Sequence, residues 1–165
     1  MKVDTPEEYY NKIARAYNEL YGEEQLQKAL FLKQLVDFSE QDLILDVGSG
    51  TGHYLKVFKG KFVCVDPSKE LLSKNPYEKY VAKAESLPFP DKHFDYTLSL
   101  TAVQNFSDIN KAIDEMVRVT KKAIYISTME VSKVNPILKK VLSSKGLRFT
   151  NKKFNKEIFY IIELK

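Results

Sequence analysis

The clearest indication of a functional site in this sequence is a set of three glycines at alternate positions, Gly48, Gly50 and Gly52. They follow a short apolar run over residues 43–47 that is compatible with a β-strand, and the pattern after about Gly52 opens a helix. Glycine suits such a turn because its backbone can adopt a positive φ and a ligand can approach the main chain closely. The spacing therefore predicts a nucleotide-type cofactor site in this turn.

Two acidic residues frame the turn. Asp46 precedes the first glycine by two positions, and Asp66 ends the next strand-like run about 20 residues later, the offset at which Rossmann-like folds place an acid on ribose hydroxyls. We therefore expect Asp66 to bind a ribose. The dinucleotide fingerprint is G-x-G-x-x-G, whereas this chain has G-x-G-x-G. An NAD-dependent oxidoreductase, which would share the sheet and Asp66, is therefore disfavoured.

With Asp46 included, the string D-x-G-x-G-x-G resembles the first motif of class I S-adenosylmethionine (SAM) dependent methyltransferases. A second stretch, residues 82–99, resembles the "D-A-E-x-L-P-F-x-D … F-D" segment of the branch that includes the ubiquinone and menaquinone biosynthesis methyltransferases. The resemblance covers roughly residues 9–125. It implies a Rossmann-like fold, methyl transfer, and SAM as the cofactor.

The resemblance also implies which residues bind the cofactor. The glycines of the first motif would line its methionine part, and Asp66 would hold its ribose. In the family an aspartate and the alanine after it contact the adenine; the matching residues here are Lys83 and Ala84. Lys83 departs from this pattern, so the side-chain acceptor for the adenine amino group is missing unless Glu85 substitutes, and the departure bears on cofactor affinity. The expected cofactor-binding residues are Asp46, Gly48, Gly50, Gly52, Asp66, Pro67, Ala84, Glu85, Leu100, Tyr10 and Tyr17.

Tyrosines recur near the N-terminus at helical spacing. Tyr10, Tyr17 and Tyr21 fall on one helical face. Core packing is the common explanation of such a face. A sulfonium, however, is a cation without N–H donors, and aromatic rings can stabilise it by cation–π attraction. The family's "Y-x-x-x-A-x-x-Y" segment, which covers the cofactor, is matched by Tyr10, Ala14 and Tyr17.

The sequence indicates no acid or base for the reaction, and the catalytic residues are left unassigned. Methyl transfer is an in-line displacement whose leaving group is already activated by its positive charge, so positioning can supply most of the catalysis. His53, beside the glycine turn, and His93 are more consistent with surface positions. The end of the fourth strand faces the reactive methyl in this fold. The pocket candidates are Leu100, Thr101, Gln104, Asn105 and Tyr17.

One substrate class is disfavoured at this strand end. Methyltransferases that act on the amino nitrogens of adenine and glutamine carry an N/D-P-P-Y/F string there. Residues 99–102 of this chain read Ser-Leu-Thr-Ala instead.

The elements that must position these residues alternate between strand and helix patterns, which predicts a mostly parallel sheet covered on both faces. A helix capped by Thr5 is expected to run to about Leu20, and a helix capped by Ser107 to Val119. Further helices are expected over residues 23–38 and 135–144. Strands are expected over residues 43–47, 62–65, 79–82, 94–100, 123–128, 146–154 and 157–164. The last two are expected to form a terminal hairpin. Class I methyltransferases end with such a pair, so the resemblance implies an α/β fold, a seven-stranded Rossmann-like methyltransferase sheet with a C-terminal antiparallel hairpin.

Length and composition indicate one domain, because 165 residues with 44% hydrophobic and 29% charged residues are typical of a single globular unit. We expect residues 1–165 to form one methyltransferase domain, with N-terminal helices in residues 1–40 as a candidate lid and a Rossmann-like core in residues 41–165. The start lacks the apolar core of a signal peptide, and no apolar run reaches the roughly 18 residues of a membrane span. A cytoplasmic protein without membrane contact is expected, with Cys64 as a small buried hydrophobe.

Charge is unevenly distributed along the chain. Residues 121–165 hold 11 basic and 3 acidic residues, a balance of +8, whereas residues 1–120 have a balance of −4. Such asymmetry is typical of a protein with an anionic partner, here tRNA, rRNA or an acidic protein surface, although exposed lysines also serve solubility.

The minimal core favours an acceptor in the translation machinery over a small metabolite. Insertions that shape a substrate pocket have no room in this chain, so the hypothesis includes a small activator protein of the zinc-ribbon kind. A small-molecule acceptor similar to a quinone precursor and a non-catalytic SAM-binding scaffold are the alternatives.

Overall fold

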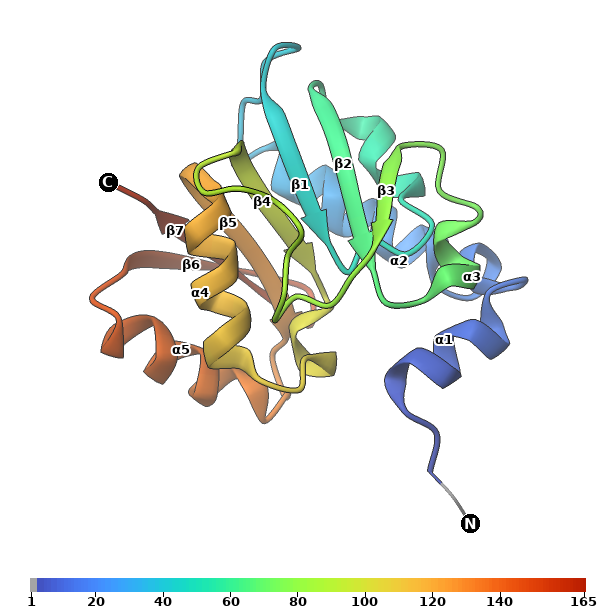
Figure 1. The fold of residues 1–165 in the computed structure, drawn as a ribbon. Coiled ribbons are helices and arrows are strands. Elements are labelled where there is room, and N and C mark those ends of the chain that lie inside the picture. The colour runs from blue at the N-terminus through green and yellow to red at the C-terminus, as the bar shows by residue number, and fades with distance from the viewer. Residues whose placement is uncertain (1–2) are drawn as a thin grey trace.

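A single seven-stranded sheet forms the centre of the computed structural model, which describes residues 3–165 (Figure 1). The strands are β1 (Leu43–Val47), β2 (Lys61–Asp66), β3 (Glu78–Val81), β4 (Phe94–Leu100), β5 (Thr120–Met129), β6 (Arg148–Phe154) and β7 (Glu157–Glu163). Their order across the sheet is β3-β2-β1-β4-β5-β7-β6. Strands β1 to β5 pair in parallel, and β7 pairs antiparallel with both β5 and β6. The predicted Rossmann-like methyltransferase sheet with its terminal hairpin is confirmed.

Helices cover both faces of this sheet (Figure 1). The helical segments are α1 (Pro6–Ile13), α2 (Tyr17–Lys33), η1 (His53–Val57), α3 (Lys69–Leu72), η2 (Val103–Asn105), α4 (Ile109–Val119) and α5 (Val134–Ser144), of which η1 and η2 are 3-10 helices. Helices α4 and α5 pack on one face, and α2 with η1 packs on the other. Within residues 3–165, no helix combines the length and the apolar character that crossing a membrane requires.

The core consists of two apolar layers separated by the sheet. Successive side chains of a strand point to opposite faces, so Ile44 packs with Ala29 of α2 while Leu45 packs with Ile113 of α4. Because both faces are covered, β1 and β2 are buried along nearly their whole length rather than at alternate positions. Cys64 is fully buried in one layer, as predicted, and burial raises the pKa of its thiol to about 12.

The prediction of one N-terminal helix running to about Leu20 was wrong. The capping residue Thr5 is as predicted, but residues 14–16 break the helix, and α1 and α2 are separate. The break lets α1 turn and lie against the segment of α3, where the Ser68 hydroxyl donates to Asn11 Oδ1 at 2.5 Å. This tertiary contact overrides the local helical preference.

The second helix was predicted over residues 23–38, with Leu26, Leu30 and Leu35 at helix-compatible spacing. Helix α2 begins earlier and ends at Lys33, and Leu30 is 39% exposed. The buried residues of α2 are Gly22, Gln25, Lys28, Ala29 and Leu32. The buried face is therefore rotated from the predicted one, and it includes two polar side chains.

Two helix starts also differ from the predictions. The segment after Gly52 is a five-residue 3-10 helix rather than a longer helix. Helix α4 is capped by Asp108, whose carboxylate accepts from Lys111 N at 3.0 Å, and not by Ser107. The reason is that Ser107 donates from its own N–H and hydroxyl to Glu85, at 2.7 and 3.0 Å.

Candidate cofactor-binding site

A cavity of about 560 Å³ lies at the carboxyl ends of β1, β2 and β4, next to α1 and the start of α2. Its volume falls within the roughly 300–1,000 Å³ typical of small-molecule sites. The chain order reverses between β1 and β4, and open parallel sheets bind ligands at such a switch point. The cavity therefore lies where the topology alone would place a ligand.

The glycine turn forms one wall of the cavity. Gly48 and Gly50 line it with φ angles of 75° and 53°, values that favour glycine. A Cβ on Gly48 would lie 2.4 Å from the Ala102 Cβ, so no larger residue fits there without movement. Gly52 is behind the wall, where a Cβ would lie 2.6 Å from Asn75 Nδ2. Gly48 and Gly50 thus expose main chain to a ligand, whereas Gly52 is required by packing.

Asp66, at the end of β2, lines the cavity and fixes the turn. Its Oδ2 accepts from Gly50 N at 2.9 Å and its Oδ1 from Ser68 N at 2.8 Å. Burial raises the pKa of this carboxyl to about 6 despite these hydrogen bonds. A carboxylate has about four acceptor sites, so Asp66 retains capacity for two ligand hydroxyls. The neighbouring Pro67 lines the cavity as well.

Asp46 lies behind the cavity wall rather than on it. The carboxylate is fully buried and accepts a hydrogen bond from the Tyr54 hydroxyl, while its Oδ1 has no partner. Burial raises the pKa of Asp46 to about 7. Asp46 and Gly52 are therefore the two predicted cofactor residues that the structure does not bring to the cavity surface.

The loop after β3 forms a second wall, with Lys83, Ala84 and Glu85 lining the cavity. Glu85 Oε1 accepts from Asp108 N at 3.1 Å in addition to the two bonds from Ser107. One oxygen of Glu85 is thus engaged in ordering the start of α4. The Lys83 side chain is exposed, and Ala84 is buried.

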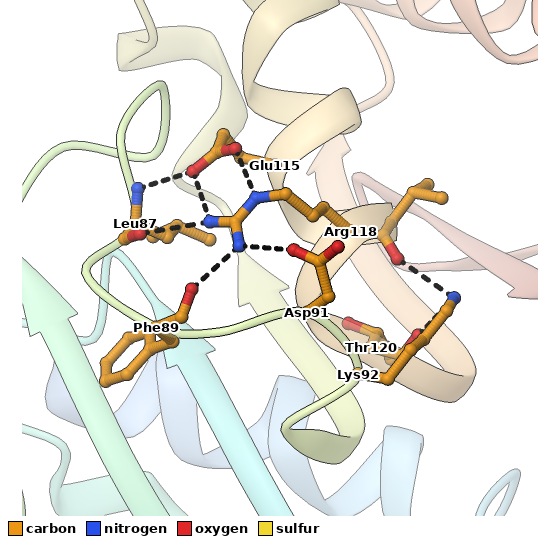
Figure 2. A network of polar contacts seen from close by, with 8 residues as sticks. Leu87, Phe89, Asp91, Lys92, Glu115, Arg118 and Thr120 are labelled. Carbon is orange, nitrogen blue, oxygen red and sulfur yellow. Dashed lines mark hydrogen bonds and ion pairs between the residues drawn. The ribbon is translucent and has the colours of Figure 1, made fainter.

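Arg118 of α4 holds this loop in place (Figure 2). Its guanidinium donates to the carbonyls of Leu87 and Phe89, at 3.1 and 2.7 Å, and to the carboxylates of Glu115 and Asp91. Glu115 in turn accepts from Leu87 N at 2.8 Å. The network connects the loop that carries Ala84 and Glu85 to a helix of the core.

The three predicted tyrosines meet at the cavity although they lie on two helices. Tyr10 of α1 is 6.1 Å from Tyr17 of α2 between ring centroids, and Tyr17 is 5.4 Å from Tyr21. All three line the cavity, and a Cβ added to Gly50 would lie 3.8 Å from the Tyr17 ring. Burial raises the pKa of Tyr17, so its hydroxyl is neutral. The aromatic rings are therefore adjacent to the turn expected to bind the methionine part.

The end of β4 forms the remaining wall. Leu100, Thr101, Gln104 and Asn105 line the cavity, as the sequence predicts. Thr101 has a φ of 54°, and non-glycine residues in such conformations concentrate at functional sites. Its N–H donates to Ser127 O at 3.0 Å.

Residues of α2 and β7 also lie beside this strand end, and the sequence did not predict them as site residues. Glu24, Gln25 and Lys28 line the cavity, and Glu157 of β7 contacts Lys28 at 3.0 Å. The available signal was the spacing of the small residues Gly22 and Ala29, which mark the close-packed face of α2 and place Gln25 and Lys28 on it.

The two histidines do not line the cavity. His53 lies beside α2, with Nε2 2.9 Å from Gly22 O. His93 is exposed and stacks on Phe89 with ring centroids 6.2 Å apart. His93 is thus at the surface, as the sequence predicts, whereas His53 is half-buried against α2.

Comparison with known proteins gives a consistent family. A family model described as a methyltransferase domain matches residues 45–126. The uncharacterized protein MJ1252 of Methanocaldococcus jannaschii is 33% identical over 153 residues, which cover 87% of this chain and 59% of that protein. The ubiquinone/menaquinone biosynthesis C-methyltransferase UbiE of Rickettsia bellii is 34% identical over 138 residues, covering 72% of this chain and 55% of that protein. The chain thus spans between half and three fifths of the length of these relatives.

Solved structures agree on the fold. A SAM-dependent methyltransferase from Aquifex aeolicus superposes with a TM-score of 0.75 at 19% identity, covering 98% of each chain. A methyltransferase solved in complex with the Haloferax volcanii activator Trm112 superposes with a TM-score of 0.84 at 13% identity, covering 95% of this chain and 96% of that one. At these identities the likeness concerns the fold alone.

Proposed function

Because the chain belongs to the class I SAM-dependent methyltransferase family, we propose that it transfers a methyl group from SAM to tRNA, rRNA or a protein of the translation machinery. One structural observation supports methyl transfer from SAM as the reaction. A single cavity brings together the glycine turn, the acid at the end of β2, the loop after β3 and the end of β4. The sequence predicted cofactor or pocket residues in each of these four segments.

The residues of the cavity fit this cofactor. The main chain of Gly48 and Gly50 would lie against its methionine part, Asp66 would accept from its ribose hydroxyls, and Ala84 and Glu85 would border its adenine. When bound, SAM supplies a methyl group carried on a positively charged sulfur. The protein then needs only to orient the acceptor and exclude water, because the leaving group requires no protonation.

The tyrosines and the end of β4 would perform this orienting role. Tyr10 and Tyr17 lie between the glycine turn and solvent, where their rings would stabilise a sulfonium and exclude water. Leu100 and Thr101 border the same space from the sheet. We assign these four residues to positioning rather than to acid or base catalysis.

The basic C-terminal third would act as a docking surface. Among the residues that the structure places along the cavity wall, Met129 is the one member of residues 121–165. Exposed lysines lie instead on α5 and around the β6–β7 hairpin, including Lys139, Lys140, Lys152 and Lys156. An RNA or an acidic protein bound there would be held outside the cavity while its reactive group enters it.

A small activator protein is part of the proposal. The methyltransferase of the Haloferax volcanii Trm112 complex, which has the same fold over nearly its whole length, was solved with such a partner. The present chain resembles it in having little beyond the sheet and its covering helices. A partner would extend the recognition surface that the basic C-terminal third provides.

A small-molecule acceptor is the second candidate. The relative from Rickettsia bellii is named as a quinone-biosynthesis C-methyltransferase, and it is 34% identical over 72% of this chain. A scaffold that binds SAM without catalysis is the alternative outside enzymes.

The proposal is tested first by calorimetric titration with SAM, S-adenosylhomocysteine and NAD. Binding of the first two at micromolar concentration without binding of NAD supports the cofactor assignment, and binding of NAD alone would overturn it. Transfer of a radiolabelled methyl group is then measured to tRNA, ribosomal proteins and a quinone precursor, with and without a Trm112-type protein. Labelling of the quinone precursor alone would favour the second candidate, and no labelling of any acceptor would favour the scaffold.

A further inference from the structure

The wall of the cavity at the end of β4 contains a buried charged cluster that the cofactor assignment does not use. Its centre is Lys28 of α2, which is 4% exposed. The ammonium lies 2.8 Å from Glu24 Oε1 and 3.0 Å from Glu157 Oε1, and it donates to Thr101 Oγ1 at 2.9 Å. Glu157 is 3% exposed, and its second oxygen accepts from Thr101 Oγ1 at 3.2 Å.

The lysine in this cluster has no donor left for a ligand. An ammonium has three N–H donors, and Lys28 has three oxygen partners. Two carboxylates face one ammonium, so the cluster has a formal charge of −1. An anionic ligand at this wall would meet a negative cluster whose cation is already engaged.

Two glutamines beside the cluster add oxygens without donors. Gln104 donates through Nε2 to Thr101 O at 2.6 Å, and because a carbonyl only accepts, this bond fixes the amide orientation. The opposite atom, Gln104 Oε1, is buried and has no partner. Gln25 is 8% exposed, and its Oε1 is also buried without a partner. Both residues line the cavity.

From this juxtaposition we propose that the acceptor substrate is an alkyl amine, whose nitrogen binds beside the exposed carboxylate of Glu24 at this wall. The inference rests on the proposed methyltransferase function and names its substrate class. An amine brings the N–H donors that the glutamines lack and a positive charge that the cluster attracts. A phosphate or carboxylate brings neither. Among macromolecules, protein N-termini and lysine side chains carry this group.

Methyl transfer to an alkyl amine is chemically compatible with the charged residues of this wall. An alkyl ammonium has no free electron pair, so one proton must first leave the nitrogen, and Glu24, exposed at the rim, can pass it to water. The freed pair forms the new N–C bond as the C–S bond breaks, and the pair of the C–S bond stays on sulfur. The positive charge moves to the methylated nitrogen, where the cluster stabilises it.

The proposal also agrees with the end of β4. The string typical of methyltransferases acting on adenine and glutamine nitrogens is absent at residues 99–102. Those nitrogens are planar and conjugated, whereas an alkyl amine is tetrahedral and nucleophilic once deprotonated. An alkyl amine therefore does not require that string.

The test compares butylamine, butanol and butyrate, which share a chain and differ in the head group. Each is titrated by NMR into the full chain saturated with S-adenosylhomocysteine, whose own binding is measured separately by calorimetry. Butylamine is expected to bind at least about tenfold more tightly than butyrate and butanol. Glu24→Gln, at a side chain that is 63% exposed, should fold normally and weaken butylamine binding about fivefold. The control is Glu23→Gln on the same helix, because Glu23 binds Gln27 and does not line the cavity.

The outcomes separate the two proposals. If S-adenosylhomocysteine binds and butyrate or butanol binds as tightly as butylamine, the amine assignment fails and the proposed function stands. Equal butylamine affinity of the Glu24→Gln and Glu23→Gln variants would also overturn the amine assignment. If S-adenosylhomocysteine does not bind, both proposals fail.

Discussion

Asp66 combines two tasks at the scale of a single residue, since it fixes the glycine turn and is expected to bind the ribose. Asp66→Ala removes the acceptor for Gly50 N and the expected bonds to two hydroxyls. Hydrogen bonds to a charged group contribute about 1.5–3 kcal/mol each, so SAM affinity should fall at least about tenfold in a calorimetric titration. Glu70→Gln, an exposed change on α3, is the control. Unchanged SAM affinity of Asp66→Ala would refute the assignment.

Asp46 predicts a pH dependence of stability. Burial raises its pKa from 3.8 to about 7, so the folded state binds the proton more tightly than the unfolded state. Its contribution to the free energy of unfolding is then fully present below about pH 4 and is lost as the pH rises through about 7.

Asp46→Asn removes this titration. Denaturant unfolding at pH 5 and pH 8 should show a smaller loss of stability in the variant than in the wild type, by on the order of a few kcal/mol. Asp66 titrates in both proteins, and its charge is one of the causes of the raised pKa of Asp46, after burial. A variant that loses as much stability as the wild type over this range would contradict the assignment.

Tyr17 offers a test of sulfonium recognition. Tyr17→Leu removes the aromatic face beside the glycine turn, and cation–π attraction of about 0.5–2 kcal/mol acts on the charged sulfur of SAM but not on neutral S-adenosylhomocysteine. The affinity for SAM should therefore fall more than that for S-adenosylhomocysteine, by roughly 2- to 30-fold. Tyr9→Leu serves as control, because Tyr9 is 40% exposed and does not line the cavity. Equal losses for the two ligands would rule out the cation–π role.

At the scale of elements, the loop after β3 depends on α4 through Arg118 (Figure 2). Arg118→Ala should lower the free energy of unfolding by about 1–2 kcal/mol, since the side chain is 31% exposed and its bonds are partly screened. SAM affinity should fall as well, because Ala84 and Glu85 lie on the same loop. Lys111→Ala, an exposed change on α4, should leave both quantities unchanged. A fully stable Arg118→Ala protein with normal SAM affinity would contradict this role.

Among the elements, some features of the site could be predicted from the sequence and others could not. The glycine turn, the end of β2 and the end of β4 have local signatures, because strand ends and left-handed turns restrict the residue types allowed. The helix break at residues 14–16 contains no proline or glycine, so its cause lies in the distant contact with α3. Lys28 and Glu157 meet although they lie near opposite ends of the sequence, and no local pattern signals such a pair.

At the scale of the whole molecule, the order of the strands explains why one cavity collects residues that are spread along the chain from Thr5 to Met129. Helices cover both faces of the sheet, so the carboxyl edge of the parallel strands is where its backbone and loops meet a ligand. Sequence patterns indicated the strands, most clearly the short apolar runs of β1 and β2, and the resemblance to class I methyltransferases implied the count of seven. The angle at which α1 crosses this edge depends on packing between segments far apart, which periodicity does not contain.

The separation of α1 from α2 has a consequence for the outer surface of the molecule. None of the residues of α1 is buried, and Pro6, Glu7 and Tyr10 line the cavity. A bound cofactor would therefore supply contacts that α1 otherwise lacks, and segments with few buried contacts are the first to open. Trypsin should cut after Arg15, an exposed residue in the break, faster in the free chain than in the chain saturated with S-adenosylhomocysteine. Equal cutting rates would show that α1 is insensitive to the ligand.

If α1 does respond in this way, the outside of the protein changes with the supply of its methyl donor. A partner that binds on α1 would then distinguish loaded from empty enzyme without contacting the cavity. Recruitment of the enzyme to its substrate would follow the cell's ratio of methyl donor to spent donor.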